Sequence, residues 1–407
     1  MSAVFELDPA AEAEKAAGRT PKPPVEEQHG RLQRVRASLE HHGLNGLVVY
    51  GGAGINPEPL RYLSGYVNVF PGAAAVLLVP LERPPVLLVD QPWHLEEAQR
   101  MAWVDDVRAF PPAGRTWQAA ELRRTLAEAL DATGLKGARV GGFAAVMPVA
   151  FAEALADAVL MDGGAVWADV VGSPSAYDVE QIRATAAIAD EGFAAAVEAA
   201  GEGVPEHQVC FAALSGMASL GAEFLHGSGV STHINIGSYS DVVSNVRPYL
   251  YSSRPLQRGQ MFWLDLSASH DGYFIDSDRT ISVGEPSDEQ LRIYGVAKAM
   301  YDVMLSEARA GITGGRLWEL ANDVAVEAGY GDWSNHVYLG HTTGITTSSR
   351  PVVARGETGE LRAGSFLNVE PGIFVPGTGS ACIENTLYLT ESGASPINGF
   401  DIDIQIV

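Results

Sequence analysis

Basic residues are scarce in this chain. Among its 407 residues, 27 lysines and arginines face 50 aspartates and glutamates, which gives a formal net charge of −23. Nucleic acids and anionic membranes bind basic surfaces, so we expect neither of them as a partner. Apolar runs of about 18 residues are also missing, and we therefore expect no membrane-spanning helix.

Cysteine is scarce as well. Cys210 and Cys382 are too few for a disulfide framework, and no CxxC pair occurs. A reducing cytoplasm is therefore the expected location. The first 30 residues lack the basic and apolar regions of a signal peptide. Because they are acidic at first and rich in proline later, we expect residues 1–28 to form a loosely ordered arm.

Helical and strand-like patterns alternate over 29–171, which indicates an α/β domain. Examples are the helical RLQRVRASLEHHG, the apolar GLVVY that follows it, and the two buried strands in AAAVLLVPLERPPVLLVD. A long Ala-rich helix then begins near Ser175 or Asp178, either of which suits an N-cap. Short strands, Gly/Ser turns and helices at 288–311 and 315–328 complete a second domain over 172–407, of α+β type.

The segment FWLDLSASHDGYFIDSDRT (262–280) places aspartates in two strand-like runs. Asp265 and Asp276 are 11 residues apart, and the DGY between the runs is typical of a turn. If the strands pair across this turn, the two carboxylates can lie side by side. Like charges that close repel unless a cation or a proton lies between them. The alternative is that both acids face a loop and stay solvated.

Three further ionisable residues occur in apolar, strand-like surroundings. His341 lies in YLGHTTGI, Glu370 ends the run FLNVE, and Glu384 lies in ACIENTLYLT. Taken singly, such a histidine is more often a core or surface residue, and a glutamate at a strand end is usually solvated. Together with two aspartates they suit two divalent ions, Mn²⁺ first, with Zn²⁺, Fe²⁺ or Co²⁺ as alternatives. Such a pair activates a water and polarises a substrate oxygen.

The order and surroundings of these residues resemble the methionine aminopeptidase/prolidase/creatinase superfamily with the pita-bread fold. The resemblance is carried by WLDLSASHDGYFIDSDRTISVG, GHTTG, NVEPGIF and IENTLYLT, which follow the family's order of motifs. Because the family's Arg-Thr pair follows Asp276 as Arg279 and Thr280, Asp276 rather than Asp278 is the second ligand. The five matching metal-ligand positions are Asp265, Asp276, His341, Glu370 and Glu384.

This resemblance covers roughly 172–400, and NPEPLRYLSGY resembles the creatinase/prolidase N-terminal domain more weakly. It implies an α+β chain in which an α/β creatinase-like N-terminal domain precedes a pita-bread catalytic domain. It also implies two metal ions with a bridging hydroxide that attacks an amide or peptide bond of a small molecule or short peptide. A homodimer is expected from the resemblance alone.

The resemblance also implies a role for each ligand. Asp265 would chelate one ion, His341 would bind the other as part of the catalytic set, and Asp276 and Glu384 would bridge the two. Glu370 would be both a ligand and the proton shuttle, acting first as general base and then as general acid.

The chain departs from the family's peptidases at two outer histidines. One normally lies about 17 residues before the first aspartate, where this chain has Pro248, and the other about seven residues after the ligand histidine, where it has Ser348. An arginine common in prolidases is replaced by Cys382. Since such outer groups bind the scissile carbonyl, their loss puts Xaa-Pro cleavage in question without touching metal binding.

Three residues near these gaps are candidates for substrate binding. Arg247 and Arg350 would suit an anionic small substrate, although either could equally be a surface or structural ion-pair residue. His233 is a third candidate, and it lies farther upstream than the family's histidine.

Three functions stay open at this point. The first is a metal-dependent hydrolase of Xaa-Pro aminopeptidase or prolidase type. The second is an offshoot that attacks non-peptide C–N bonds, as creatinase-like and ectoine-hydrolase-like members do, or that eliminates, as a dimethylsulfoniopropionate-lyase-like member does. The third is a catalytically dead binding protein, which the retention of all five ligands disfavours.

Overall fold

The computed structural model describes residues 22–52, 57–67, 73–90, 92–110, 119–143, 145–223, 234–236, 253–334 and 338–407. The chain divides between Val170 and Val171 into two compact units, called here the N-terminal unit and the C-terminal unit. Among the helices in these ranges, none combines the length and the hydropathy that crossing a bilayer requires.

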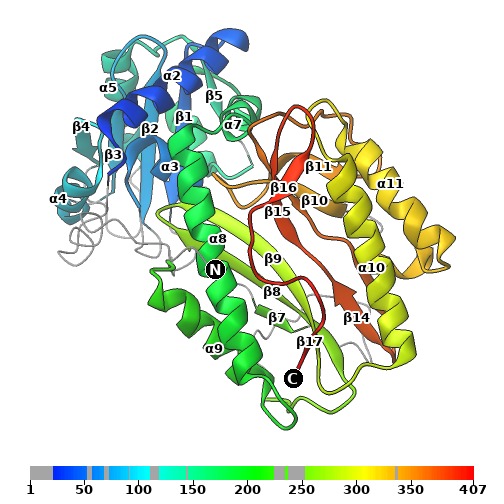
Figure 1. The fold of residues 1–407 in the computed structure, drawn as a ribbon. Helices are drawn as coiled ribbons and strands as arrows, with labels where there is room; N and C mark the ends of the chain where they lie inside the picture. The colour runs from blue at the N-terminus through cyan, green and yellow to red at the C-terminus, as the bar shows by residue number, and fades with distance from the viewer. Residues whose placement is uncertain are drawn as a thin grey trace. The chain divides into compact units, whose positions relative to one another are not determined.

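The N-terminal unit is built around one six-stranded sheet with the strand order β4-β3-β2-β1-β5-β6 (Figure 1). β2 runs antiparallel to both of its neighbours, and the remaining pairs are parallel. Its elements are α2 (Val25–His41), β1 (Gly46–Gly52), α3 (Pro57–Ser64), β2 (Ala74–Pro80), β3 (Val86–Val89), α4 (Pro92–Met101), β4 (Asp106–Ala109), α5 (Ala119–Thr133), β5 (Arg139–Gly142), α6 (Val149–Ala154), β6 (Val159–Asp162) and α7 (Gly164–Val171).

Continuous apolar sequence explains the centre of this sheet. Every residue of β2 and β3 is buried, as expected for strands that are covered on both faces. Helix α2 begins at Val25, so residues 25–28 of the predicted arm are helical. Pro24 precedes the helix with a φ of −51°, a value that proline fixes in advance. Glu26 and Glu27 lie in the first turn, where the helix dipole favours negative charge.

The C-terminal unit contains a five-stranded sheet (β11-β10-β12-β15-β16), a four-stranded sheet (β17-β9-β8-β7) and the two-stranded β13-β14. Its elements are α8 (Ala176–Ala199), α9 (Glu206–Ser219), β7 (Ile234–Ile236), β8 (Met261–His270), β9 (Tyr273–Ser282), α10 (Asp288–Glu307), α11 (Gly314–Glu327), the 3₁₀ helix η1 (Gly331–Trp333), β10 (Tyr338–Thr343), β11 (Ser349–Ala354), β12 (Phe366–Val369), β13 (Gly372–Val375), β14 (Gly379–Cys382), β15 (Asn385–Leu389), β16 (Ala394–Pro396) and β17 (Gln405–Ile406).

Helices cover the sheets of this unit. α8 packs on β8 and β9, whereas α10 packs on β13 and β14 and α11 on β11 (Figure 1). The start of α8 is fixed by a capping box, in which Ser175 and Asp178 each accept a hydrogen bond from the other's backbone N–H. Asp178 also accepts a 2.7 Å hydrogen bond from the hydroxyl of Tyr273. The helix is therefore tied to the first residue of β9.

The β8–β9 hairpin sets the register of the acidic residues. Its two turn residues, Asp271 and Gly272, have φ values of +49° and +84°, as in the type I′ turn that favours Asp-Gly. This turn pairs Asp265 with Asp278, and it pairs Asp276 with Ser267. The two strands therefore pair across the turn as expected, but Asp265 and Asp276 are offset by two residues and are not cross-strand partners. Because the loop contains only two residues, the partner of Asp265 is Asp278, and Asp276 lies two positions before it in β9. Side chains two positions apart in a strand lie on the same face.

Arg279 is the largest fully buried side chain in the described part of the protein. Its guanidinium occupies the junction between β9, the start of β15 and the C-terminal segment. The acceptors of its hydrogen bonds are the carbonyls of Asp278 (2.8 Å), Glu384 (2.7 Å), Phe400 (2.8 Å) and Asp401 (2.9 Å) and the side-chain oxygen of Asn385 (2.9 Å). One arginine thus holds three separate segments of the unit together.

Replacing Arg279 by lysine should destabilise the C-terminal unit. A lysine keeps the charge but cannot fill the planar set of acceptors, and a buried charge without its partners costs about 3 kcal/mol. We expect the thermal unfolding midpoint to fall by about 6 to 12 °C. Arg258→Lys is the control, because Arg258 is exposed and pairs with Glu202 on the surface. Equal midpoints for both variants would contradict this role of Arg279.

Candidate metal centre

Strands β8 and β9 and the residue before β15 bring three carboxylates into one row. Asp265 of β8 is paired with Asp278 of β9. Asp278 in turn exchanges two backbone hydrogen bonds with Glu384, with N–O distances of 3.3 and 3.2 Å. In a sheet, residues paired in this way extend their side chains from the same face. The backbone therefore places the side chains of Asp265, Asp278 and Glu384 next to one another.

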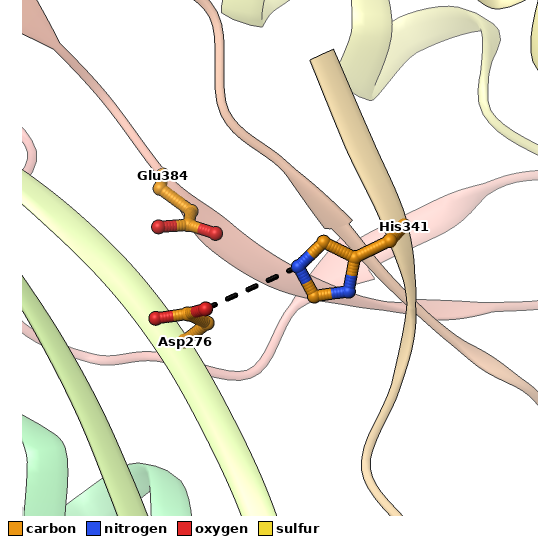
Figure 2. A group of neighbouring side chains, drawn as sticks. All are labelled: Asp276, His341 and Glu384. Carbon is orange, nitrogen blue, oxygen red and sulfur yellow. Dashed lines mark ion pairs between the residues drawn. The ribbon is translucent and has the colours of Figure 1, made fainter. Parts of the chain in front are cut away.

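The side chains form two groups that share Glu384. Oxygen or nitrogen atoms of Asp276, His341 and Glu384 lie within 4.8 Å of one another, and so do oxygens of Asp265, Asp278 and Glu384. Figure 2 shows the first group, with the two carboxylates and the imidazole pointing toward one another. The structure thus brings four of the five predicted ligands together and adds Asp278.

His341 presents one ring nitrogen to the carboxylates. Its Nε2 lies 4.0 Å from Oδ2 of Asp276 (Figure 2), and its Nδ1 lies 3.3 Å from the carbonyl of Thr342. Because a carbonyl only accepts, Nδ1 carries the hydrogen in this contact, and Nε2 keeps the lone pair that a metal ligand needs. Burial lowers the pKa of His341, and the charge of Asp276 opposes this shift. The neutral, ligating form is therefore favoured.

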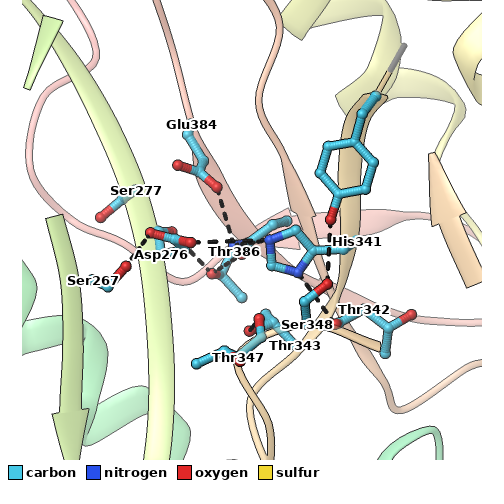
Figure 3. A network of polar contacts seen from close by, with 12 residues as sticks. Ser267, Asp276, Ser277, His341, Thr342, Thr343, Thr347, Ser348, Glu384 and Thr386 are labelled. Atoms are coloured by element: carbon cyan, nitrogen blue, oxygen red, sulfur yellow. Dashed lines mark hydrogen bonds and ion pairs between the residues drawn. The ribbon is translucent and has the colours of Figure 1, made fainter. Parts of the chain in front are cut away.

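Polar neighbours hold the ligands in place. Strand β12 puts Asn368 opposite His341 of β10 and also opposite Thr386 of β15. The Asn368 amide nitrogen donates to Oε1 of Glu384 at 3.1 Å and lies 3.4 Å from Nε2 of His341, and its oxygen accepts from the Thr386 hydroxyl. Ser267 donates to Oδ1 of Asp276 at 2.7 Å (Figure 3).

The same two causes, burial and neighbouring negative charge, raise the pKa values of Glu384 and Glu370. Burial raises the pKa of Glu384 well above its usual value, and the charges of the neighbouring aspartates and of Glu370 raise it further. Burial likewise raises the pKa of Glu370, followed by the charges of Asp278 and Asp276. Glu370, directly after β12, therefore lies in the same electrostatic environment although it belongs to neither group of three.

Asp278 and Cys382 are two further buried residues of the site. Burial raises the pKa of Asp278 to about 8, against the opposing effect of a hydrogen bond from the Cys382 thiol. Burial also raises the pKa of Cys382 well above its usual range. A protonated, buried thiol is a poor nucleophile, so Cys382 suits a packing role.

The residues present fit divalent metal ions. Within the described residues, Oδ1 of Asp278 and Oε1 of Glu370 are buried side-chain oxygens without a hydrogen-bond partner. Buried carboxylates without partners are costly, and a cation removes that cost. Carboxylate oxygens with one imidazole nitrogen are ligands that Mn²⁺, Fe²⁺, Co²⁺ and Zn²⁺ accept.

Of the three residues predicted to bind substrate, Arg350 is the one that lies within the described residues. Arg247, His233 and the gap position Pro248 lie outside the described residues. Arg350 is 75% exposed and donates to Oε2 of Glu357 from Nε at 3.0 Å and from Nη2 at 2.7 Å. The ion-pair role that the sequence left open for Arg350 is thus the one that the structure describes, and its part in substrate binding stays a prediction.

Ser348, at the second gap position, lies beside the histidine of the site. Its hydroxyl is 3.3 Å from the hydroxyl of Tyr338, whose ring stacks on His341 with centroids 5.8 Å apart. Figure 3 shows this group of hydroxyls next to the imidazole.

Sequence reasoning missed Asp278, Asn368, Thr386 and Ser267. Asn368 lies in the NVEPG motif itself, two residues before Glu370, so strand alternation could have placed it on the same face. Ser267 and Asp278 depend on the register of the hairpin, and Thr386 depends on a pairing between distant strands. Neither kind of pairing follows from the spacing of a motif.

The fold and this centre together define a class of protein, in which an α/β N-terminal domain precedes a pita-bread domain with a carboxylate-rich candidate metal centre. Residues 180–391 match the metallopeptidase family M24, and residues 31–184 match the creatinase/prolidase N-terminal domain. The first match alone spans more than half of the 407 residues. The chain belongs to metallopeptidase family M24, which confirms the family predicted from the motifs.

Curated relatives match part of their own length. An Xaa-Pro dipeptidase of Pyrococcus horikoshii is 32% identical over 220 residues, which are 54% of this chain and 60% of that protein. An Xaa-Pro dipeptidase of Lactobacillus helveticus is 34% identical over 152 residues, 37% of this chain and 41% of that protein. The matched part is therefore less than two thirds of either relative.

Solved structures share the fold over almost the whole chain. An Xaa-Pro dipeptidase from Bacillus anthracis has a TM-score of 0.77 at 23% identity and covers 93% of this chain and 100% of its own. A prolidase from Thermococcus sibiricus has a TM-score of 0.79 at 19% identity and covers 95% and 100%. These likenesses confirm the predicted fold class.

Glu384 is the residue that the two groups share, so its loss should affect both. In Glu384→Ala we expect the protein to retain less than a tenth of the wild-type content of divalent ions after equilibration with Mn²⁺ and gel filtration, as measured by plasma mass spectrometry. Glu391→Ala removes an exposed glutamate a few residues farther along and should leave the content unchanged. Wild-type metal content in Glu384→Ala would refute the site.

The raised pKa values predict how pH affects stability without metal. Asp278 has a pKa of about 8 in the native state, against about 3.9 for a solvated aspartate. Between these values the native state holds a proton that the unfolded state has released, so this group's contribution to stability falls as pH rises from about 4 to about 8. A cation bound at this centre would take the place of the proton, so Mn²⁺ should raise the unfolding midpoint more at pH 8 than at pH 6. Calorimetric shifts of equal size at both pH values would contradict this.

Proposed function

We propose that this protein is a two-metal hydrolase that cleaves an amide or peptide C–N bond in a small substrate, with the Xaa-Pro dipeptidases as its nearest functional model. The observation that carries the proposal is the pair of ligand groups that share the buried carboxylate of Glu384. Two ions that share a bridging ligand suit the activation of a water against a polarised carbonyl.

Divalent ions at this centre would supply Lewis acidity and lower the pKa of a water molecule. The chain's own residues supply the rest. Asp276, His341 and Glu384 would hold one ion, and Asp265 with Glu384 the other. Burial, followed by the charges of Asp278 and Asp276, raises the pKa of the Glu370 carboxyl well above its usual value, and a group that accepts and returns a proton needs a raised carboxyl pKa. Glu370 would therefore accept a proton from the attacking water and deliver it to the leaving nitrogen.

Two named relatives support the dipeptide-sized substrate. Both matched Xaa-Pro dipeptidases are named for cleavage of short peptides. Mn²⁺ is the proposed metal because four carboxylates and one imidazole make a predominantly hard ligand set. A homodimer in the cytoplasm stays a prediction from the resemblance and from the low cysteine content.

A second candidate function rests on position 348. Peptidases of the family usually have a histidine there, whereas this chain has an exposed serine bonded to Tyr338. Hydroxyls can donate to an oxyanion, but a changed donor set changes which carbonyl fits. An offshoot that hydrolyses a non-peptide amide, with the same metal centre, is therefore the alternative to a plain prolidase.

A substrate panel separates the two functions. Purified protein loaded with Mn²⁺ is incubated with Xaa-Pro dipeptides, Xaa-Xaa dipeptides and N-acyl or cyclic small amides, and released amine is measured. Loss of one preorganised donor costs about 100- to 1,000-fold in turnover, so we expect Xaa-Pro cleavage far below about 10 per second. Glu370→Gln, which keeps the shape but cannot shuttle a proton, is the inactive control.

Each result of the panel has a clear meaning. Rapid cleavage of several Xaa-Pro dipeptides would show that the protein is a prolidase and would exclude the offshoot. Slow dipeptide cleavage with faster hydrolysis of another amide would favour the offshoot. Absence of metal-dependent hydrolysis on every substrate, in a protein that binds two ions, would contradict the proposed function.

A further inference from the structure

Asp278 occupies the centre of the carboxylate row rather than its edge. It is paired with Asp265 on one side and exchanges two backbone hydrogen bonds with Glu384 on the other. The side chain is 3% exposed, and its oxygen lies within 4.8 Å of ligand oxygens of both neighbours. Asp278 thus has acidic residues paired with it on both sides, whereas the cross-strand partner of Asp276 is Ser267.

The Cys382 thiol hydrogen-bonds to Asp278, but a neutral thiol does not balance the charge of a carboxylate. The adjacent Arg279 donates its hydrogen bonds to carbonyls and to the side chain of Asn385 rather than to the carboxylate of Asp278. Oδ1 of Asp278 has no hydrogen-bond partner among the described residues. Like charges directly opposite each other in a sheet are destabilising. A cation between Asp278, Asp265 and Glu384 removes this repulsion.

We propose that Asp278 is a sixth metal-ligating residue, which contributes a carboxylate oxygen to the ion held by Asp265 and Glu384. This inference rests on the two-metal centre of the proposed function and adds a ligand to the five that the family motifs supply. Strand alternation brings Asp276 and Asp278 to the same face of β9. One strand therefore serves both ions, Asp276 with His341 and Asp278 with Asp265.

An additional hard oxygen ligand has a consequence for metal choice. Zn²⁺ is typically four-coordinate and accepts nitrogen and sulfur readily, whereas carboxylate-rich sites suit Mn²⁺. The ion next to Asp278 should therefore favour Mn²⁺ over Zn²⁺ more strongly than the ion next to His341. Removing the carboxylate of Asp278 should weaken one of the two sites and shift its preference toward Zn²⁺.

Titration calorimetry of the metal-free protein with Mn²⁺, and competition with Zn²⁺, tests this directly. Asp278→Asn keeps the side-chain volume, and Asp278→Ser removes any atom that reaches the ion. We expect one Mn²⁺ site to weaken by about 10- to 100-fold or more, with the greater loss in the serine variant, while the other site keeps its affinity. Asp302→Asn is the matched control, because it removes one carboxylate from an exposed helix position and should change neither site.

A second measurement separates ligation from misfolding and from an indirect effect. Mn²⁺ X-ray absorption should show fewer oxygen neighbours per ion in Asp278→Ser than in the wild type. Circular dichroism of metal-free Asp278→Asn should match the wild type, because the amide relieves the carboxylate repulsion and its oxygen can still accept the hydrogen bond from the Cys382 thiol.

The outcomes are distinct from those of the proposed function. A wild-type protein that binds two Mn²⁺ ions, together with Asp278 variants that bind both with wild-type affinity, overturns the role of Asp278 alone. A well-folded wild-type protein that binds no divalent ion overturns the two-metal proposal and this inference with it. One weakened site with an unchanged oxygen count per ion assigns Asp278 an indirect role and also overturns ligation.

Discussion

The two backbone hydrogen bonds between Asp278 and Glu384 are the constraint on which the site depends. They join β9 of the four-stranded sheet to the residue that precedes β15 of the five-stranded sheet. This junction brings the acids of the β8–β9 hairpin next to the glutamate that precedes β15, although the two segments are far apart in the sequence. Arg279 holds the same junction from the other side of the strand, through the carbonyls of both paired residues. Metal ligation and fold stability thus depend on the same few atoms.

The second consequence of this junction is electrostatic. It gathers carboxylates whose burial, followed by their mutual repulsion, raises the pKa values of Glu384 and Glu370. Burial of that much negative charge opposes folding unless a proton or a cation compensates it. The protein therefore gives up stability in the metal-free state to obtain a preorganised cation site. Asn368 limits the freedom of this site, because it contacts both His341 and Glu384 and is itself held by Thr386.

The sequence predicted the family, the fold class and the residues that could bind metal, because each ligand lies in a short motif with its own local signature. It did not predict the grouping of these ligands. The type I′ turn at Asp271 and Gly272 could be read from DGY, but the exact partner of Asp265 depends on how many residues the loop contains. The position of Asp278 beside Glu384 depends on a contact between residues more than 100 positions apart, which local patterns do not carry. Arg350 shows the converse limit, since its sequence context left a substrate-binding role and an ion-pair role equally open, and the ion pair with Glu357 became visible only in the structure.

Anomalous diffraction from crystals grown with Mn²⁺ tests the central claim most directly, because it locates each ion among the side chains. The account predicts two peaks per chain, one among Asp276, His341 and Glu384 and one among Asp265, Asp278 and Glu384. A single peak, or a second peak that lies away from the carboxylate of Asp278, would contradict the six-ligand centre described above.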